Sequence, residues 1–399
     1  MEKLRSGRAT CLILGLILGL GTLPAGAGRA SAADEIVIGE IHPITGPATF
    51  YGLPESRGIQ LAADRINKAG GVTLGGKSYQ IRIATEDDQA SPTTGVAALR
   101  KLVSADVRFI IGPLASGVAP ALKPIIERND KLTQLIDGTI ADDMTNGKNI
   151  FRNQATASGY NVAVVKLFSA RKYKSVAMMT DRFHAGFMNS QKTLAADLKG
   201  LGVTTASEDF YKLGDTDFSA TLTNLRGRNV DVLLIRGYPA EGALITKQAR
   251  QLGFSGQVVW EMVSPPSTVL KNIPAAEMEG VFNCIPLTTE DYVKLGDEKA
   301  KALDQAYRGR FNEGPGELTA LSYDAVYIFK AAFEKAGSLD NAAVNKAMAA
   351  LKVADIPELV TRYTPQPDGR LFASDGQVDL RGEVSVWRGE GWEPASLKD

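Results

Sequence analysis

Short apolar runs alternate with helix-length stretches along most of this chain, and this alternation is what most constrains its fold. The strand-like runs are at 35–41, 79–85, 109–112, 133–137, 175–180, 203–210, 231–236, 257–262 and 280–284. Helical patterns lie at 55–68, 91–105, 118–129, 157–171, 186–199, 217–227, 239–252, 265–272, 296–312 and 318–336. Strands separated by helices predict an α/β fold of parallel sheets covered on both faces. These strand–helix units are more than one compact sheet can hold, and we therefore expect two lobes.

The first 32 residues have the three parts of a secretion signal. A short basic stretch precedes an apolar run over 9–23, and Ala30-Ser31-Ala32 fits the small-residue cleavage pattern. A membrane-spanning helix needs about 20 apolar residues, more than this run contains. We therefore expect residues 1–32 to be a removable signal peptide, and the remainder to be an exported soluble protein.

Cysteine content and charge narrow the class further. Of the two cysteines, Cys11 lies in the predicted signal, so Cys284 is left without an intrachain disulfide partner. Stability must then come from packing. Loss of the signal would reduce the 45 basic and 45 acidic residues to 41 and 44. Such a balance offers no electrostatic attraction to nucleic acid.

One motif is misleading. Residues 71–78 satisfy the phosphate-loop expression G-x-x-x-x-G-K-[ST], which requires a strand before it and a helix after it. Here a helical pattern precedes it and a strand follows, so we interpret the segment as a glycine-rich hairpin that binds no nucleotide. Nucleophile-elbow, H-E-x-x-H and C-x-x-C motifs are missing, and the only histidines are His42 and His184. We predict no enzyme activity, no cofactor and no metal site.

The loops after the strands are the candidate ligand site, because open parallel sheets bind ligands beside the carboxyl ends of their strands. Ser116, between 109–112 and the next helix, could hold a ligand carboxylate or simply cap that helix. Asp137 could accept a hydrogen bond from a ligand amine or serve as a cap. Tyr51 and Tyr238 could clamp an apolar ligand or only pack against their neighbours.

Several motifs occur in an order and spacing that carry a family resemblance. They are Thr45-Gly46-Pro47, Tyr51-Gly52, Gly70-Gly71, Asp87-Asp88, Ile111-Gly112-Pro113, Phe151-Arg152 and Leu321-Ser322-Tyr323-Asp324-Ala325. From about Glu35 to its end, the chain resembles the leucine/isoleucine/valine-binding proteins of bacterial ABC transporters. The resemblance implies a type I periplasmic binding fold, with two doubly wound parallel-sheet lobes joined by three crossover strands. The implied lobes are residues 33–153 with 284–364, and residues 154–283 with 365–399.

The resemblance also implies a set of ligand contacts: Tyr51, Ala115, Ser116, Asp137, Gly138, Thr139, His184, Tyr238 and Glu261. The family's carboxylate for a ligand α-amino group falls on Glu261, with Val263 as an alternative. The sequence departs from the family pattern in two features. The family's small disulfide is absent, since its positions are Ala90 and Ala115. Asp137-Gly138 replaces an uncharged pair, and Phe183 and His184 lie where a side chain often covers the ligand.

The resulting hypothesis is a monomeric periplasmic receptor that captures an amino acid or related small molecule by hinge closure. It would deliver the ligand to a membrane permease driven by ATPase subunits. A sensor of the same fold, presenting its closed form to a signalling partner, is the first alternative. The second is uptake of an amide, a urea-like compound or an aromatic acid. A hydrolase using the paired carboxylates is the least favoured.

Overall fold

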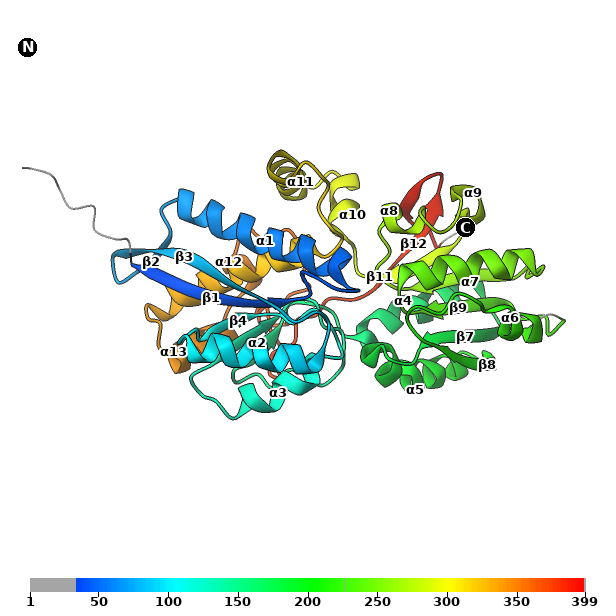
Figure 1. Cartoon of the computed structure of the whole chain (residues 1–399), viewed down its shortest axis with the longest axis horizontal. Helices are drawn as coiled ribbons and strands as arrows, with labels where there is room; N and C mark the ends of the chain where they lie inside the picture. The colour runs from blue at the N-terminus through cyan, green and yellow to red at the C-terminus, as the bar shows by residue number, and fades with distance from the viewer. Residues whose placement is uncertain (1–33, 226, 398–399) are drawn as a thin grey trace, which may run out of the picture. The chain divides into compact units, whose positions relative to one another are not determined.

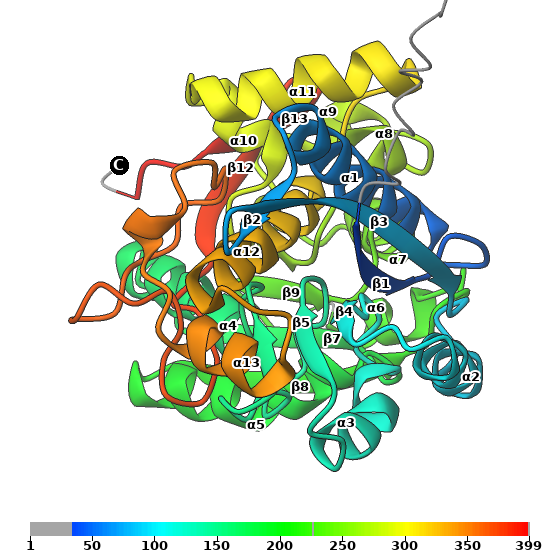
Figure 2. The ribbon, with the colours of Figure 1, turned by 90° about the vertical axis from the view of Figure 1, so that its left-hand side faces the viewer.

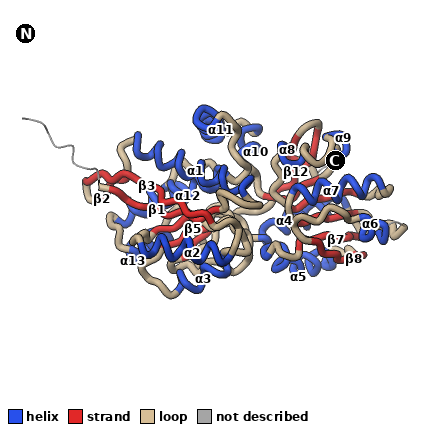
Figure 3. Tube along the Cα trace, viewed as in Figure 1, coloured by secondary structure: helices blue, strands red, loops and turns tan. Residues whose placement is uncertain are grey.

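The computed structural model describes residues 34–225 and 227–397, and the predicted signal peptide lies outside them. In this part of the chain, strands and helices form two lobes, each a mostly parallel sheet with helices on both faces (Figure 1, Figure 3). The described residues include no helix long and apolar enough to cross a membrane. The predicted α/β fold of two lobes is confirmed.

The first lobe is built on a six-stranded sheet with the order β2-β3-β1-β4-β5-β6. Its strands are β1 (Glu35–His42), β2 (Val72–Leu74), β3 (Lys77–Asp87), β4 (Phe109–Ile111), β5 (Thr133–Ile136) and β6 (Ile150–Arg152). Neighbouring strands are parallel except β2 and β3, which form a hairpin.

Both faces of this sheet are covered, because successive side chains of a strand point to opposite faces. Phe109 and Ile111 of β4 pack in one core with α1 (Thr49–Lys68) and α12 (Thr319–Ala336). Ile110 between them packs in a second core with α2 (Pro92–Ser104) and α3 (Ala119–Glu127). Figure 2 shows α12 and α13 (Asn341–Ala349) on one side of the strands and α2 and α3 on the other.

The second lobe contains a seven-stranded sheet with the order β13-β12-β11-β10-β9-β7-β8. Its strands are β7 (Ser175–Asp181), β8 (Thr204–Tyr211), β9 (Val232–Arg236), β10 (Gln257–Glu261), β11 (Phe282–Ile285), β12 (Glu383–Arg388) and β13 (Gly391–Pro394). Strands β7 to β11 pair with one another in parallel, and β12 and β13 are antiparallel additions at the β11 edge.

Adjacent residues of β7 again divide the core between two faces. Met178 packs with α4 (Ala157–Arg171) and α5 (Ala185–Gly200). Met179 packs with the helices of the opposite face. These are α6 (Ser219–Leu225), α7 (Pro239–Gln251), α8 (Pro266–Val269) and α9 (Ala275–Met278).

The chain passes between the lobes three times. It leaves the first sheet after β6, and returns after β11 through α10 (Thr289–Lys294) and α11 (Glu298–Phe311) to α12. After α13 and a short 3-10 turn (Val353–Asp355) it crosses again to β12. On this last passage Leu371 and Phe372 belong to the core of the first sheet. The predicted lobe boundaries stay a prediction, but these contacts place the segment just after residue 365 with the first lobe.

Two local features refine the expectations from sequence. Residues 71–78 form the β2–β3 hairpin with positive φ angles at Gly75 and Gly76, so the predicted glycine-rich hairpin is confirmed. Helix α1 begins at Thr49, whereas the helical pattern predicted a start at 55. This first turn contacts the end of β1, since a Cβ on Gly52 would lie 2.4 Å from the Pro43 carbonyl oxygen.

Candidate ligand-binding site

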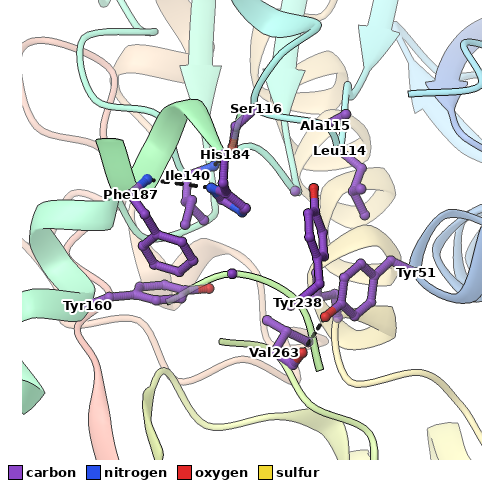
Figure 4. A pocket seen from close by; sticks show the side chains of 13 residues that line it. Tyr51, Leu114, Ala115, Ser116, Ile140, Tyr160, His184, Phe187, Tyr238 and Val263 are labelled. Atoms are coloured by element: carbon purple, nitrogen blue, oxygen red, sulfur yellow. Dashed lines mark hydrogen bonds between the residues drawn. The ribbon is translucent and has the colours of Figure 1, made fainter. Parts of the chain in front are cut away.

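The carboxyl ends of both sheets meet around one partly open cavity of about 50 Å³. The first lobe contributes the following residues, from α1 and the loops after β4 and β5: Tyr51, Leu114, Ala115, Ser116, Gly138 and Ile140. The second lobe contributes these, from α4 and α5 and from the loops after β7, β9 and β10: Tyr160, His184, Phe187, Gly237, Tyr238 and Val263. Leu318, just before α12, completes the lining (Figure 4).

Aromatic rings form most of the cavity wall. The His184 ring is stacked on Phe187 at a centroid distance of 4.3 Å, and Tyr238 is 5.3 Å from His184. Tyr51 lies 6.4 Å from Tyr238, and Tyr160 lies 6.4 Å from Phe187. Such rings bury a large apolar area and present hydroxyl groups at their tips. The cavity therefore suits a small ligand with an apolar body.

A few hydrogen bonds fix the polar groups of the wall. The Ser116 Oγ accepts from the Ile140 amide at 3.2 Å, which joins the loops after β4 and β5. The Tyr51 hydroxyl donates to the Val263 carbonyl, a contact between the two lobes (Figure 4). Ser116 was predicted to cap the following helix or to bind ligand. Its Oγ does not cap that helix but bonds to a neighbouring loop, and because the residue lines the cavity, the ligand contact stays a prediction.

The orientation of the His184 ring is fixed because the ring caps the N-terminus of α5. Its Nδ1 accepts from the Phe187 amide at 3.4 Å, so the proton of the neutral ring is on Nε2. Burial, and then the nearby Arg236 guanidinium, lower the pKa of His184 to about 4. The side chain is therefore uncharged at neutral pH and supplies one N–H donor. The adjacent Phe183 is 71% exposed and does not line the cavity.

Asp137 and Thr139 do not line the cavity, although both were predicted as contacts. Asp137 is fully buried, and both of its carboxylate oxygens lie 3.2 Å from the Nε2 atom of His42. The Thr139 hydroxyl donates to the carbonyls of Pro113 and Leu114, at 2.8 and 3.2 Å. Both side chains point away from the cavity because these partners lie within the first lobe. Only Gly138 between them reaches the lining.

Glu261 is also turned away from the cavity. It is fully buried and pairs with Arg236, whose Nε donates to its Oε2 at 2.6 Å. Burial raises the pKa of Glu261 to about 7, against the effect of the Arg236 charge. Val263, the alternative for the same position, does line the cavity. The geometry thus favours Val263 at this position.

The described residues contain no group of three or more histidine, cysteine or acidic side chains arranged to hold a metal ion. Cys284 is buried in the second lobe.

Comparison with known proteins places the chain in a family. A family model described as "Periplasmic binding protein" matches residues 35–379. The chain belongs to the periplasmic binding protein family. The Leu/Ile/Val-binding protein BraC3 of Rhizobium johnstonii is 32% identical over 347 residues, covering 85% of this chain and 90% of that protein. A leucine-, isoleucine-, valine-, threonine- and alanine-binding protein of Pseudomonas aeruginosa is 27% identical, over 81% and 84% of the two chains.

Solved structures show the same fold as this periplasmic binding protein. A leucine-binding protein from Thermotoga maritima superposes with a TM-score of 0.77 and 23% sequence identity, over 90% of this chain and 98% of that one. The predicted family and the type I fold with two α/β lobes are thereby confirmed.

Several lining residues of this periplasmic binding protein were missed by sequence reasoning. Tyr160 and Phe187 lie on the first turns of α4 and α5, and Ile140, Leu114 and Leu318 lie in loops. Their apolar or aromatic character is equally typical of core residues, so residue type alone could not identify them. Nearness to a strand end was a usable signal for Ile140, which lies four residues after β5.

Proposed function

We propose that this chain is the periplasmic solute receptor of an ABC-type importer, and that it binds a small molecule between its lobes. The observation that carries this proposal is a cavity walled by both lobes and bridged by the hydrogen bond from Tyr51 to the Val263 carbonyl. The related proteins are named for binding leucine, isoleucine and valine, and in one case also threonine and alanine. These names support a ligand of about amino-acid size.

Hinge closure is the proposed mechanism. A ligand that contacts Tyr51 and Ser116 on one lobe and His184 and Tyr238 on the other binds the closed form better than the open form. It therefore shifts the population toward the closed form, to an extent set by the difference between its affinities for the closed and open forms. The closed receptor would be recognised by a membrane permease coupled to ATPase subunits. This role agrees with the proposed export of the chain, in which residues 1–32 act as the removable signal peptide.

We propose a binding role without catalysis. Among the lining residues, the two side chains that could form a nucleophile–base pair are Ser116 and His184. Ser116 Oγ is hydrogen-bonded to the Ile140 amide, and the His184 Nδ1 accepts from the Phe187 amide. The His184 acceptor atom is therefore occupied in capping α5, and cannot accept a proton from Ser116.

Calorimetry and small-angle scattering test the proposal. The mature chain, freed of bound ligand by unfolding and refolding, would be titrated with amino acids, their amides and the corresponding acids. We expect at least one solute to bind and to reduce the radius of gyration. The Tyr51→Phe variant is the matched control, since it keeps the ring and loses the bridging hydroxyl; it should close less readily. Absence of binding and closure with every solute would refute the receptor function.

A further inference from the structure

The carbonyl groups around the first-lobe side of the cavity are already hydrogen-bonded. The Thr139 hydroxyl occupies the Pro113 and Leu114 carbonyls. The buried Arg152 guanidinium donates through Nη1 to the carbonyls of Thr139 and Ala141, at 3.1 and 2.5 Å. These oxygens therefore already have donors within the protein, and a cationic group of a ligand would have to share them.

Three more carbonyls near the site also accept hydrogen bonds within the protein. The Ile140 carbonyl accepts from the Ala157 amide at 2.7 Å, and the Tyr238 carbonyl accepts from the Gly242 amide at 3.0 Å. The Val263 carbonyl accepts the hydroxyl of Tyr51. The carbonyls named here, from loops of both lobes, thus already have donors within the protein.

Hydrogen-bond donors, by contrast, remain available. The Ser116 hydroxyl accepts from the Ile140 amide and keeps its own proton to donate, and the neutral His184 presents its Nε2–H. The hydroxyls of Tyr160 and Tyr238 have no hydrogen-bond partner among the described residues, and both rings border the cavity (Figure 4). Burial raises the pKa of both tyrosines above the ordinary value, so both hydroxyls remain protonated donors.

The buried charges behind the cavity wall also favour an anionic ligand. Two fully or nearly fully buried arginines lie behind it, Arg152 in the first lobe and Arg236 in the second. Among the described residues, no carboxylate side chain lines the cavity. Asp137 is bonded to His42 and Glu261 to Arg236, so their charges are already paired.

Asp181 and Glu241 lie near the Tyr238 hydroxyl, and each carboxyl accepts one amide hydrogen bond, from Phe183 and Gly214 respectively. Glu317, next to the lining residue Leu318, is a third carboxyl close to the site. Its Oε2 has no hydrogen-bond partner among the described residues, and the group influences the nearby hydroxyls of Tyr51 and Tyr160. Burial, with the nearby carboxyls of Asp291 and Glu290, raises the pKa of Glu317 well above its ordinary value. Its charged form is therefore disfavoured, which weakens its attraction for a ligand cation.

We propose that the ligand is a small organic acid with an apolar body, bearing a carboxylate but no protonated amino group. This inference rests on the proposed receptor function and narrows its ligand class. Four donors would surround the carboxylate, and the aromatic wall would cover the body. An α-amino acid would instead bury its ammonium group beside carbonyls that are already bonded, and an unpaired buried charge is strongly unfavourable.

Matched ligand pairs give the first test, by calorimetry on the ligand-free mature chain. The pairs are isocaproate with leucine and phenylacetate with phenylglycine, which differ only in the amino group. We expect the acid of at least one pair to bind about tenfold more tightly than its amino acid, or better, since a tenfold ratio corresponds to only about 1.4 kcal/mol. Tighter binding of both amino acids would overturn the inference and leave the receptor function standing. If neither acids nor amino acids bind, the inference fails, and the wider solute panel decides the receptor function.

Variants at two positions give the second test. Val263→Glu places a carboxylate on the cavity wall and should reverse the preference toward the amino acid, while Val263→Gln, of the same size but uncharged, should keep the preference for the acid. Glu317→Gln should leave the preference unchanged, because burial already disfavours the charged form of this carboxyl. Loss of amino-acid binding in Glu317→Gln would show that Glu317 receives an ammonium group, contrary to the inference. This variant also serves if Val263→Glu does not fold.

Discussion

Each lobe has a buried cluster of charged side chains behind the cavity, and the two clusters differ in how fully they are hydrogen-bonded. In the second lobe, Arg236 makes five hydrogen bonds with its guanidinium. One goes to Glu261, and the others reach Phe187, Gln191, Asn161 and Ser190. All three nitrogens are used, as a planar guanidinium allows.

In the first lobe the cation is a histidine among carboxyl groups. His42 Nε2 contacts Asp137 at 3.2 Å and lies 3.6 Å from Glu55, while its Nδ1 lies 3.8 Å from Glu40. Oxygens of Glu40, Glu55 and the nearby Asp88 have no hydrogen-bond partner among the described residues. Burial opposes the charge of His42, but Asp137, Glu55 and Glu40 raise its pKa to about 10.

This difference separates two ways of supporting a binding site. An arginine keeps its charge at any pH at which a protein is folded, whereas a histidine cluster changes charge with pH. Arg236 supports His184 and Phe187 from behind, and the His42–Asp137 pair supports the loop that carries Gly138. We therefore expect the second-lobe cluster to dominate stability and the first-lobe cluster to dominate its pH dependence.

Removal of Arg236 should have the largest effect. Arg236→Met leaves Glu261 and several amide and hydroxyl groups buried without a partner, so the free energy of unfolding should fall by about 3–5 kcal/mol. Urea unfolding followed by circular dichroism would measure it. The double variant Arg236→Met with Glu261→Leu should recover much of the loss, because apolar residues can replace a buried ion pair. A single variant within about 1 kcal/mol of the parent would show that the pair contributes little.

The pH dependence of stability tests the first-lobe cluster. The pKa of His42 rises from 6.5 in the unfolded chain to about 10 in the fold, so its contribution is complete below pH 6.5 and is lost as pH rises through 10. Burial also raises the pKa values of Glu40 and Glu55, and this too makes stability fall with increasing pH. Between pH 7 and 9.5 we expect a decline of up to about 1.4 kcal/mol per pH unit from His42 alone.

A neutral pair of similar size isolates this effect. His42→Gln with Asp137→Asn removes the titrating imidazole and its acidic partner while leaving groups that can still hydrogen-bond to each other. Its free energy of unfolding should decline less steeply over the same pH range. Parallel pH profiles for the parent and the double variant would show that other groups cause the decline.

The sequence was sufficient for the fold because that prediction depends on local patterns. The spacing of strands such as 109–112 and helices such as 157–171 is visible in any short window, and the strand-end rule correctly placed Ser116 and Tyr238 at the cavity. The direction of a buried side chain depends on partners far away in sequence. Asp137 was expected to face a ligand, but its partner His42 lies 95 residues earlier. No local pattern could supply that pairing.

The smallest effects are expected for ligand affinity. They can be compared between the lobes with one cavity residue from each. We expect Ser116→Ala and Tyr238→Ala each to weaken binding of the tightest solute by about 1–3 kcal/mol, through loss of a buried donor or of a packed ring. They should differ in folding. Ser116→Ala also leaves the Ile140 amide without its acceptor, so it should lower the free energy of unfolding by about 1 kcal/mol. Tyr238→Ala should change it less, because this half-buried ring lies at a loop end.

Calorimetry and urea unfolding on the same samples separate the two effects. Tyr238→Phe distinguishes the ring from its hydroxyl, since a bound carboxylate should be weakened by loss of the donor alone. Unchanged affinity in Ser116→Ala and Tyr238→Ala would show that the ligand binds elsewhere. Weakened binding in only one of them would mean that a single lobe holds the ligand, and closure would then need a different cause.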